Sequence, residues 1–358
     1  MSGDDATADE ADKAKPDEAT EAVEATKPKA TKAKAGKAKA KAKPAKEERD
    51  GVPLTNLDQP LFDGAGATKR DLVDYLDAVR DRILPGLADR PLSVIRVHRG
   101  QEAFMQKNVP SYAPGWLRTA TFWAESSKRE VAYALCDDRR TLLWFANQRA
   151  VEYHPTLVLA DAPDHVTHLV LDLDPPEGDE GFAPAVRAAH LVRQALADVG
   201  LEGAVKTSGA KGVHVFVPVE PVPLEDSAAA TRAIAARAER LDPDVATTAF
   251  VKDERGGKVF VDATRVGGAT VVAAYSPRAR PGTPVSFPVA WDELDDIAPA
   301  DFTVHTALGH LGDRDPWAEH MPAPQALGAD LIDEGRAIPV GRVQAMHEGK
   351  RRARARRG

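Results

Sequence analysis

The sequence has a single cysteine, Cys136, among its 358 residues. One cysteine cannot form an intrachain disulfide, and it excludes a zinc site built from several cysteines. Long apolar runs are also missing, because none approaches the ~18 residues of a membrane span and the N-terminus lacks the apolar core of a signal peptide. These absences predict a protein of the reducing cytoplasm with no membrane association.

The net charge of −7 is small for the chain but is unevenly distributed. Residues 1–50 hold twelve acidic and twelve basic side chains and almost no large apolar ones, which predicts disorder. Residues 341–358 hold seven Lys and Arg against one Glu, so residues 51–340 carry a net charge of −13. A body this acidic must bind any polyanion through local basic clusters. The composition divides the chain into a tail at 1–50, a folded body at 51–320 and a C-terminal extension with a basic tail at 321–358.

The second half of the N-terminal tail, residues 27–46, alternates lysine with alanine and proline after an acidic first half. Such a segment can tether nucleic acid by releasing counterions, and its binding then weakens as salt rises. It can equally be a solubilising leader that folds back on its own acidic half. Both interpretations stay open from the sequence.

An apolar segment at 168–176 carries Asp172 and Asp174 and ends in a proline pair, which predicts a β-strand. Alternate side chains of a strand point to opposite faces, so both aspartates share one face while leucines occupy the other. Two neighbouring carboxylates repel, and a cation between them relieves the repulsion. Mg²⁺ is commonly held by two carboxylates plus substrate phosphates. A solvated strand end where Asp begins a turn is the alternative.

The segment 205–217 is predicted to fold as strand, glycine turn and strand. Its glycines let the turn backbone approach a ligand closely, and Ser208 and Lys211 lie on the same turn. Because alternate valines of the second strand face the core, His214 lies on the opposite face. These groups suit a triphosphate, whereas a lone histidine is most often structural.

Further charged groups follow in the sequence. A strand at 258–262 ends in a third carboxylate, Asp262, with Arg265 three residues later, and the basic turn 275–282 contains Arg278 and Arg280. A guanidinium group can donate two parallel hydrogen bonds to the oxygens of one phosphate, so these arginines favour phosphate recognition. Salt bridges to the nearby acidic residues are the alternative.

Periodicity predicts the remaining elements. Thr68 is expected to cap a helix that ends at Pro85-Gly86. The apolar pair Phe104-Met105 beside Lys107 is an unusual combination, and a core strand is its simplest interpretation. A polar-tipped segment holds His154. Other helices are expected at 183–199, at 225–241 and from Trp291, and strands at 92–97, 131–135, 142–145 and 269–274.

Taken in order, the motifs resemble the polymerase domain of bacterial DNA ligase D, in the archaeo-eukaryotic primase superfamily. A single Asp-x-Asp is weak evidence, but eight ordered blocks are strong. The resemblance implies an α/β (α+β) primase-like fold, with an RRM-like catalytic module beside an N-terminal α/β unit. The blocks lie at 54–58, 104–107, 152–155, 171–175, 206–215, 261–262, 275–282 and 291–294.

The resemblance also implies roles for individual residues. Three carboxylates would hold two divalent ions, Mg²⁺ or Mn²⁺, opposite a basic triphosphate site. The metal ligands would be Asp172, Asp174 and Asp262. The nucleotide would be contacted by Ser208, Lys211, His214, Arg278, Arg280, Phe104 and Met105. His154 and Arg265 would line the site near the primer end, and Lys107 would contact a DNA 5′-phosphate.

The sequence departs from the family pattern at two places, and both bear on the catalytic rate and on the choice of nucleotide more than on the chemistry. The family usually has Asp-Tyr-Leu-Arg-Asn where this chain has Asp-Ala-Thr-Arg-Val at 262–266, and Met105 replaces the second phenylalanine of a pair. Methionine stacks less rigidly on a base than phenylalanine does. A Lys-x-Asp-Gly ligase motif is absent, which favours a stand-alone polymerase chain.

The function expected from the resemblance is template-directed nucleotidyl transfer for gap filling and end processing in non-homologous end joining. The expected substrates are DNA with gaps or double-strand ends and NTP or dNTP, with ribonucleotides favoured. A Ku-type end-binding protein and a separate DNA ligase would be partners, in the nucleoid region of the cytoplasm. A non-catalytic DNA-end bridging module and a two-metal phosphodiesterase are the alternatives.

Overall fold

The computed structural model describes residues 47–340, except for 99, 125–127, 179–180 and 267–268. The predictions for the N-terminal tail up to residue 46 and for the basic residues 341–358 therefore lie outside the described residues. The described part begins a few residues before the expected boundary at 51, because strand β1 (Glu48–Arg49) pairs with β2 (Val52–Pro53). Arg49 also forms an ion pair with Asp74, at 2.6 Å, on the first helix.

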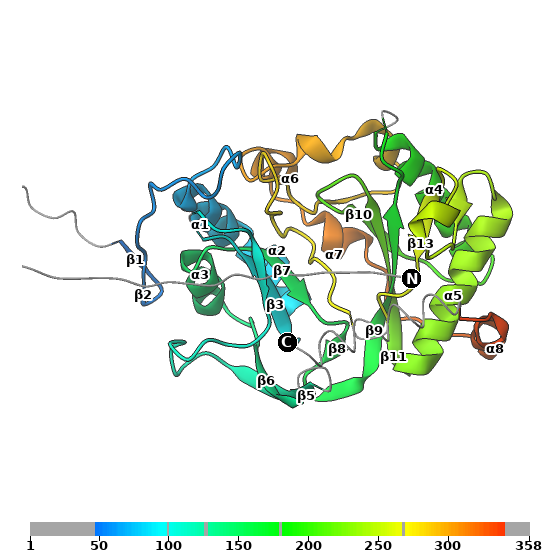
Figure 1. Cartoon of the computed structure of the whole chain (residues 1–358), viewed down its shortest axis with the longest axis horizontal. Coiled ribbons are helices and arrows are strands. Elements are labelled where there is room, and N and C mark those ends of the chain that lie inside the picture. The colour runs from blue at the N-terminus through cyan, green and yellow to red at the C-terminus, as the bar shows by residue number, and fades with distance from the viewer. Residues whose placement is uncertain (1–46, 99, 125–127, 179–180, 267–268, 341–358) are drawn as a thin grey trace, which may run out of the picture. The chain divides into compact units, whose positions relative to one another are not determined.

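A seven-stranded main sheet carries the two aspartates identified above (Figure 1). Neighbouring strands run antiparallel, except for the parallel pair β12 and β13. The order is β12–β13–β9–β11–β10–β14, with β8 paired to β9. The strands are β8 (Val158–Leu159), β9 (Ala162–Asp174), β10 (Ala204–Thr207), β11 (Val213–Pro223), β12 (Ala246–Thr247), β13 (Val259–Asp262) and β14 (Pro288–Val289).

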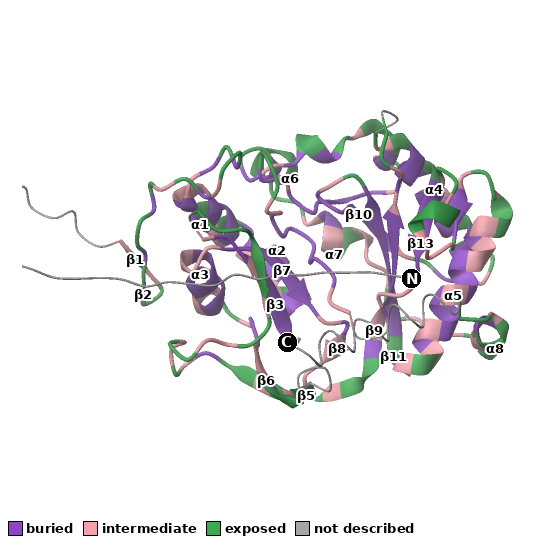
Figure 2. Cartoon of the chain, in the orientation of Figure 1, coloured by how far each residue is buried: buried purple, intermediate pink, exposed green. Residues whose placement is uncertain are grey.

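Helices α4 (Ala183–Ala197) and α5 (Leu224–Leu241) pack against one face of this sheet. Leu169, Leu171 and Leu173 of β9 are fully buried there, which is the apolar row expected from strand alternation. The opposite face carries polar side chains toward the carboxyl end of β9 and a smaller apolar cluster that includes Val166, Val170 and Phe216. Figure 2 shows β9, β10, β11 and β13 buried over much of their length.

The second sheet belongs to the N-terminal α/β unit. Its strands run in the order β4–β3–β6–β5, with β7 also paired to β3, and α3 packs on β7 and on α1. Its elements are α1 (Lys69–Ala78), α2 (Arg80–Leu87), β3 (Leu92–Arg96), β4 (Phe104–Gln106), β5 (Thr119–Ala124), β6 (Arg129–Ala134), α3 (Arg139–Asn147) and β7 (Ala150–Pro155).

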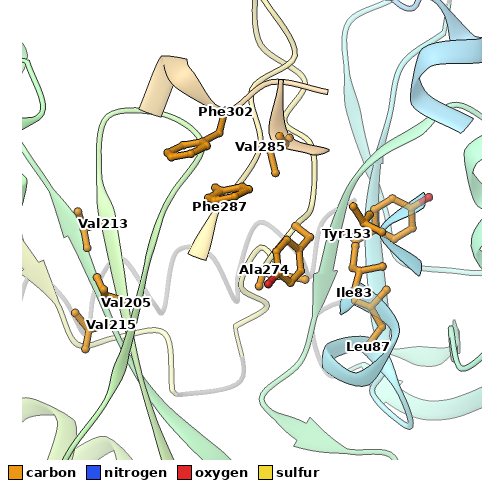
Figure 3. Packing of buried hydrophobic residues seen from close by; sticks show 14 of the residues in the cluster. Ile83, Leu87, Tyr153, Val205, Val213, Val215, Ala274, Val285, Phe287 and Phe302 are labelled. Carbon is orange, nitrogen blue, oxygen red and sulfur yellow. The ribbon is translucent and has the colours of Figure 1, made fainter. Parts of the chain in front are cut away.

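One continuous apolar core joins the two sheets. Phe287 stacks on Phe302 with ring centroids 4.0 Å apart, between the valines of the main sheet and Tyr153 of the second sheet (Figure 3). The two sheets therefore fold as one body, and the expected mixed α/β fold is confirmed. Among the described residues, no helix is long and apolar enough to cross a membrane.

Local predictions were confirmed where caps or long periodic segments specified them. Thr68 caps α1 in a reciprocal capping box with Asp71. Helices α4 and α5 agree with their predicted ranges to within two residues. The helix expected to run from Thr68 to Pro85-Gly86 is instead divided at Val79 into α1 and α2, and α2 ends at Leu87, just beyond the predicted stop.

Three predictions for short segments were wrong in whole or in part. Residues 142–145 form no strand but the centre of α3, which Asp138 caps, because a short apolar run fits a buried helix as well as a strand. The segment 269–274 is not a regular strand, although Val271 and Ala273 donate backbone hydrogen bonds to β7. Trp291 begins a turn, and the helical residues are the 3₁₀ turn η2 (Leu294–Asp296).

The described part of the C-terminal extension packs on the main-sheet module. Helix α8 (Ala329–Ala337) lies on α5, where Gly335 faces Ala229, and Gln325 pairs with Val219 at the end of β11. The other short elements are η1 (Lys252–Glu254), η3 (Pro299–Asp301), α6 (Ala307–Leu311) and α7 (Pro316–His320).

Candidate active site

Four polar side chains form a row across the open face of the main sheet. Asp262 of β13 is paired with Asp172 of β9, Asp172 with His214 of β11, and His214 with Lys206 of β10. Residues directly opposite each other on neighbouring strands point to the same face. The register therefore brings Asp172 and Asp262 together from positions far apart in the sequence. Asp174 lies on the same face, two residues along β9.

A guanidinium group lies between two of the three carboxylates. Arg265 forms ion pairs with Asp172, at 2.7 Å, and with Asp262, at 3.2 Å. Thr264 donates its backbone N–H, at 2.8 Å, and its hydroxyl, at 2.6 Å, to Asp262. The segment just after β13, where the sequence departs from the family pattern, thus holds Asp262 toward Asp172.

The two aspartates of β9 differ in their acidity. Burial and then the negative charges of Asp172 and Asp262 raise the pKa of Asp174 to about 6. Burial would also raise the pKa of Asp172, but the hydrogen bond with His214 and the positive charge of Arg265 hold it below its usual range. The site therefore has more negative charge than its own cations neutralise around Asp174.

The donor set fits hard divalent ions. Three carboxylates on one face suit Mg²⁺ or Mn²⁺, which prefer oxygen ligands and share them with water and substrate phosphates. Across the described part of the chain, no three His, Cys, Asp or Glu side chains are already gathered around one point. Arg265 stands between Asp172 and Asp262 and supplies positive charge there, so it must move before both carboxylates can share an ion.

The glycine turn after β10 lies beside these carboxylates. The hydroxyl oxygen of Ser208 accepts the N–H groups of Ala210, at 3.2 Å, and Gly212, at 3.1 Å, which closes the turn. A side chain at Gly212 would overlap the carbonyl oxygen of Leu173, so only glycine lets the turn pack this closely on β9. A cavity of about 450 Å³ opens there, lined among others by Asp174, Lys211, Lys252, Arg255 and Lys258.

Glu152 of β7 connects the second sheet to this turn. It pairs with His154, at 2.8 Å, and with the Nε of Arg278, at 3.0 Å, while Arg278 also donates to the carbonyl of Ser208. Burial opposes ionisation of Glu152, but the hydrogen bond from His154 and the charge of Arg278 lower its pKa to about 2. The carboxylate therefore holds His154 and Arg278 at the site. Arg280 lies exposed in the same turn, two residues further on.

The apolar pair lies on an exposed strand and not in the core. Phe104 and Met105 of β4 are 38% and 45% exposed, and Phe104 stacks on His98 with ring centroids 5.2 Å apart. Lys107 follows the strand and is also exposed. The interpretation of this segment as a core strand is therefore wrong, and two apolar side chains are open to a ligand.

Sequence reasoning missed a second basic pocket. Lys69 is buried and donates to the Thr55 carbonyl and to the Asn147 side chain, both at 2.6 Å, and burial followed by the charge of Arg149 lowers its pKa to about 8. The cavity measures about 200 Å³. The basic residues of its lining come from three separated segments, so no local motif marks it: Lys69, Arg96 with His98, and Arg149.

Sequence reasoning also gave no role to Glu152 or Lys206, although both lie in quoted motifs. Strand alternation provides a signal for Lys206, because it faces the same side as His214 across the predicted hairpin. Burial and the positive charge of Arg278 lower its pKa well below the usual range. For Glu152 no signal exists, because its partners come from a distant turn.

Comparisons with known proteins agree with this geometry. The family model described as LigD, primase-polymerase domain, matches residues 68–317. The chain is 38% identical over 266 residues to the multifunctional non-homologous end joining DNA repair protein LigD of Mycobacterium tuberculosis, covering 71% of this chain and 34% of that protein. It is 32% identical to the bifunctional non-homologous end joining protein LigD of Bacillus subtilis, covering 72% of this chain and 42% of that protein.

A solved structure is similar over the same region. The polymerase domain from Mycobacterium tuberculosis ligase D in complex with DNA superposes with a TM-score of 0.68 at 34% identity, covering 77% of this chain and all of that one. The chain spans about a third of the length of its mycobacterial relatives. On sequence and structure together, it belongs to the LigD primase-polymerase domain family.

Proposed function

We propose that the protein is a DNA-directed nucleotidyltransferase that fills gaps and processes ends during non-homologous end joining. The observation that carries this proposal is the register of β13 and β9, which sets Asp262 beside Asp172 on the face that also holds Asp174. A basic cavity at the glycine turn adjoins these acids. Carboxylates for dications next to cations for phosphates are the parts that phosphoryl transfer requires.

In this proposal Asp172, Asp174 and Asp262 hold two divalent ions, Mg²⁺ or Mn²⁺. Bound there, the ions supply Lewis-acid stabilisation of phosphoryl oxygens and lower the pKa of a primer 3′-hydroxyl. The acidic side chains fix negative charge where the ions bind, and Arg265 moves from between Asp172 and Asp262 toward the primer end. His154 lines the same side of the site.

The incoming nucleotide binds across the two sheets. Lys211 of the glycine turn, together with Arg278 and Arg280 of the basic turn 275–282, neutralises charge on the leaving pyrophosphate. Phe104 and Met105 offer an apolar surface to the base, and Glu152 keeps Arg278 directed at the turn. The triphosphate contacts proposed are Ser208, Lys211, His214, Arg278 and Arg280.

For DNA, the pocket around Lys69 is a candidate site for a phosphate. It is small and cationic, as a terminal 5′-phosphate requires, and Lys69 is held in place by two hydrogen bonds. Lys107 remains a proposed contact to the same end of the DNA from an exposed position. A Ku-type protein and a separate ligase are the proposed partners, because the relatives are named for end joining.

The alternatives predict different products. A non-catalytic bridging module would leave nucleotides unincorporated even though all three carboxylates are present. A two-metal phosphodiesterase would release nucleotides from DNA and produce no pyrophosphate. The turn of Ser208 and Lys211 beside the acids favours a triphosphate substrate over a diester.

The test is incorporation of one labelled nucleotide on a gapped, 5′-phosphorylated duplex with Mg²⁺, with Mn²⁺ and with EDTA. Asp172→Ala should lower incorporation more than about a hundredfold while DNA binding is retained. Asp161→Ala, an exposed acid in the turn before β9, is the matched control. Normal extension by the Asp172 variant, or metal-independent extension, would rule the proposal out. Parallel reactions with ATP and dATP test the proposed preference for ribonucleotides.

A further inference from the structure

Lys206 has no part in the mechanism above, yet it ends the polar row of the main sheet. It is fully buried, and its Nζ lies 2.9 Å from the Nδ1 of His214 and 2.6 Å from the hydroxyl oxygen of Ser286. The ring of Phe216 lies beneath it at 5.4 Å. Register explains the contact, because Lys206 of β10 is directly opposite His214 of β11.

The hydrogen bonds around His214 select one arrangement of its proton. Its Nε2 lies 3.1 Å from the carboxylate of Asp172, and an ionised carboxylate accepts hydrogen bonds and cannot donate them. The proton must therefore be on Nε2. The Nζ of Lys206 carries hydrogens whether or not it is charged, and it already donates one to Ser286, so an Nδ1 without a proton presents its lone pair to Lys206.

Ser286 fixes the direction of the lysine. The Ser286 hydroxyl donates to the Thr207 carbonyl at 2.8 Å, so its oxygen is left to accept from Lys206. The chain of donors thus runs from Lys206 to both Ser286 and His214, and from His214 to Asp172. In this hydrogen-bonded series each contact therefore has one donor and one acceptor, with Lys206 the donor at one end and the Asp172 carboxylate the acceptor at the other.

We propose that Lys206 is a positioning residue that holds His214 in the Nε2–H tautomer and fixes the plane of its ring. His214 then directs its one N–H, on Nε2, toward Asp172 beside the proposed triphosphate site. Without Lys206, Nδ1 loses its donor partner, and the contact of Nε2 with Asp172 is left to hold the ring alone, so the ring can more easily flip or change tautomer. The consequence for nucleotide binding rests on the proposed function, whereas the tautomer itself does not.

The direct test reads the tautomer by NMR of the full chain labelled with ¹⁵N-histidine, without metal or nucleotide, at neutral pH. His214→Gln identifies the signals. The wild type should show a protonated Nε2 and an unprotonated Nδ1 for His214. A protonated Nδ1, or an average of both tautomers, in the wild type would overturn the proposal whether or not the protein extends primers.

Variants then test the lysine. Lys206→Met keeps a side chain of similar length without the donor and should give averaged His214 tautomers. Ser286→Ala removes only the anchor of Lys206 and should give a smaller change in the same direction, and it serves where the Met variant does not fold. Lys69→Met, which changes another buried lysine, at the start of α1, should leave the His214 signals unchanged. Wild-type His214 signals in both the Lys206 and Ser286 variants would refute the role of Lys206.

Kinetics separate positioning from a general loss of structure. Because the ring of His214 beside the proposed triphosphate site would no longer be held by two contacts, KM for the nucleotide should rise about tenfold in the Lys206 variant, with a smaller effect on kcat. An unchanged KM together with a changed tautomer would contradict the link to the triphosphate. A wild type with the expected tautomer but no incorporation at all would refute the proposed function and leave the tautomer assignment standing.

Discussion

Of the three acids in the site, Asp174 is the one whose pKa is raised by burial and then by the negative charges of the other two. Its raised pKa, about 6, means that the folded protein binds a proton there more tightly than the unfolded chain does. The associated stability is fully present below the pKa of the unfolded chain, about 4, and is lost as pH rises through about 6. Above that pH the metal-free protein therefore carries an unfavourable ionised carboxylate.

Asp174→Asn removes that charge and should raise the Tm of the metal-free protein at pH 7.5 but not at pH 4.5. The asparagine variant should also lack the wild-type gain in stability between pH 7.5 and pH 5. Thermal unfolding with EDTA at several pH values measures both effects. Equal pH profiles for the two proteins would show that Asp174 is not the strained acid. With Mg²⁺ present, the wild type should have the higher Tm of the two proteins, because only its Asp174 carboxylate can bind the ion and stabilise the folded state.

Arg265 stands where cations are proposed to bind, so its removal should act in two opposite ways. Arg265→Gln should lower the Tm in EDTA, because Asp172 and Asp262 lose their ion pairs. It should also tighten Mn²⁺ binding several-fold by calorimetry, because no guanidinium then competes for the carboxylates. Arg336→Gln on α8 is the control, since it removes a surface ion pair with Asp226 away from the site. Weaker Mn²⁺ binding would show that Arg265 supports the ions.

For single residues, the sequence predicted on which face of the sheet a side chain lies better than it predicted which side chains that residue contacts. Strand alternation placed Asp172, Asp174 and His214 on one face, as the register shows. The register of the hairpin between β10 and β11 decides that Lys206 meets His214, and alternation alone predicted their common face but not this register. Glu152 was missed because Arg278 reaches it from a distant turn.

Among the elements, length decided which predictions succeeded. Helices α4 and α5 extend over several turns, and their periodicity left one interpretation. In α3 the residues from Leu142 to Ala146 are all buried, so the segment has no polar face to reveal a helical period. The capping residue Asp138 was the available signal.

Helix α8, beyond the matched family region, depends on a glycine contact. Gly335→Ala would place a Cβ onto the carbonyl of Ala229, which is rigid backbone of α5. The helices must separate, and we expect a loss of about 1–3 kcal/mol in unfolding free energy. Gly309→Ala in α6 is the matched control, because its added Cβ meets no atom within 4 Å. Denaturant unfolding of both variants measures the difference, and equal stability would show that α8 is not packed as described.

For the molecule as a whole, the distribution of charge matters more than its sum. Residues 51–340 carry −13, yet the two cavities proposed for phosphates are lined by Lys and Arg. An acidic body repels DNA at long range, which limits binding to places where these clusters meet phosphates. The net charge of +6 on residues 341–358 works against that repulsion.

Deletion of residues 341–358 removes seven basic side chains and should weaken non-specific binding to duplex DNA. If all seven contact phosphates, the slope of log affinity against log salt should become shallower by as much as about six. Fluorescence anisotropy between 50 and 200 mM salt, roughly the range where counterion release dominates, measures this slope. Incorporation at saturating DNA should be unchanged, and an unaltered slope would leave the segment as a solubility feature.

The N-terminal tail needs a different comparison because its two halves oppose each other. Residues 1–26 hold nine acids and two lysines, whereas residues 27–46 hold nine lysines and no acid. If the acidic half masks the basic half, deleting residues 1–26 alone should strengthen DNA binding and steepen its salt dependence. Deleting residues 1–46 should then weaken binding relative to that shorter deletion, because the lysines that released counterions are gone. Equal affinities for the two deletions would mean that the lysines do not reach DNA, and the tail would then act only on solubility.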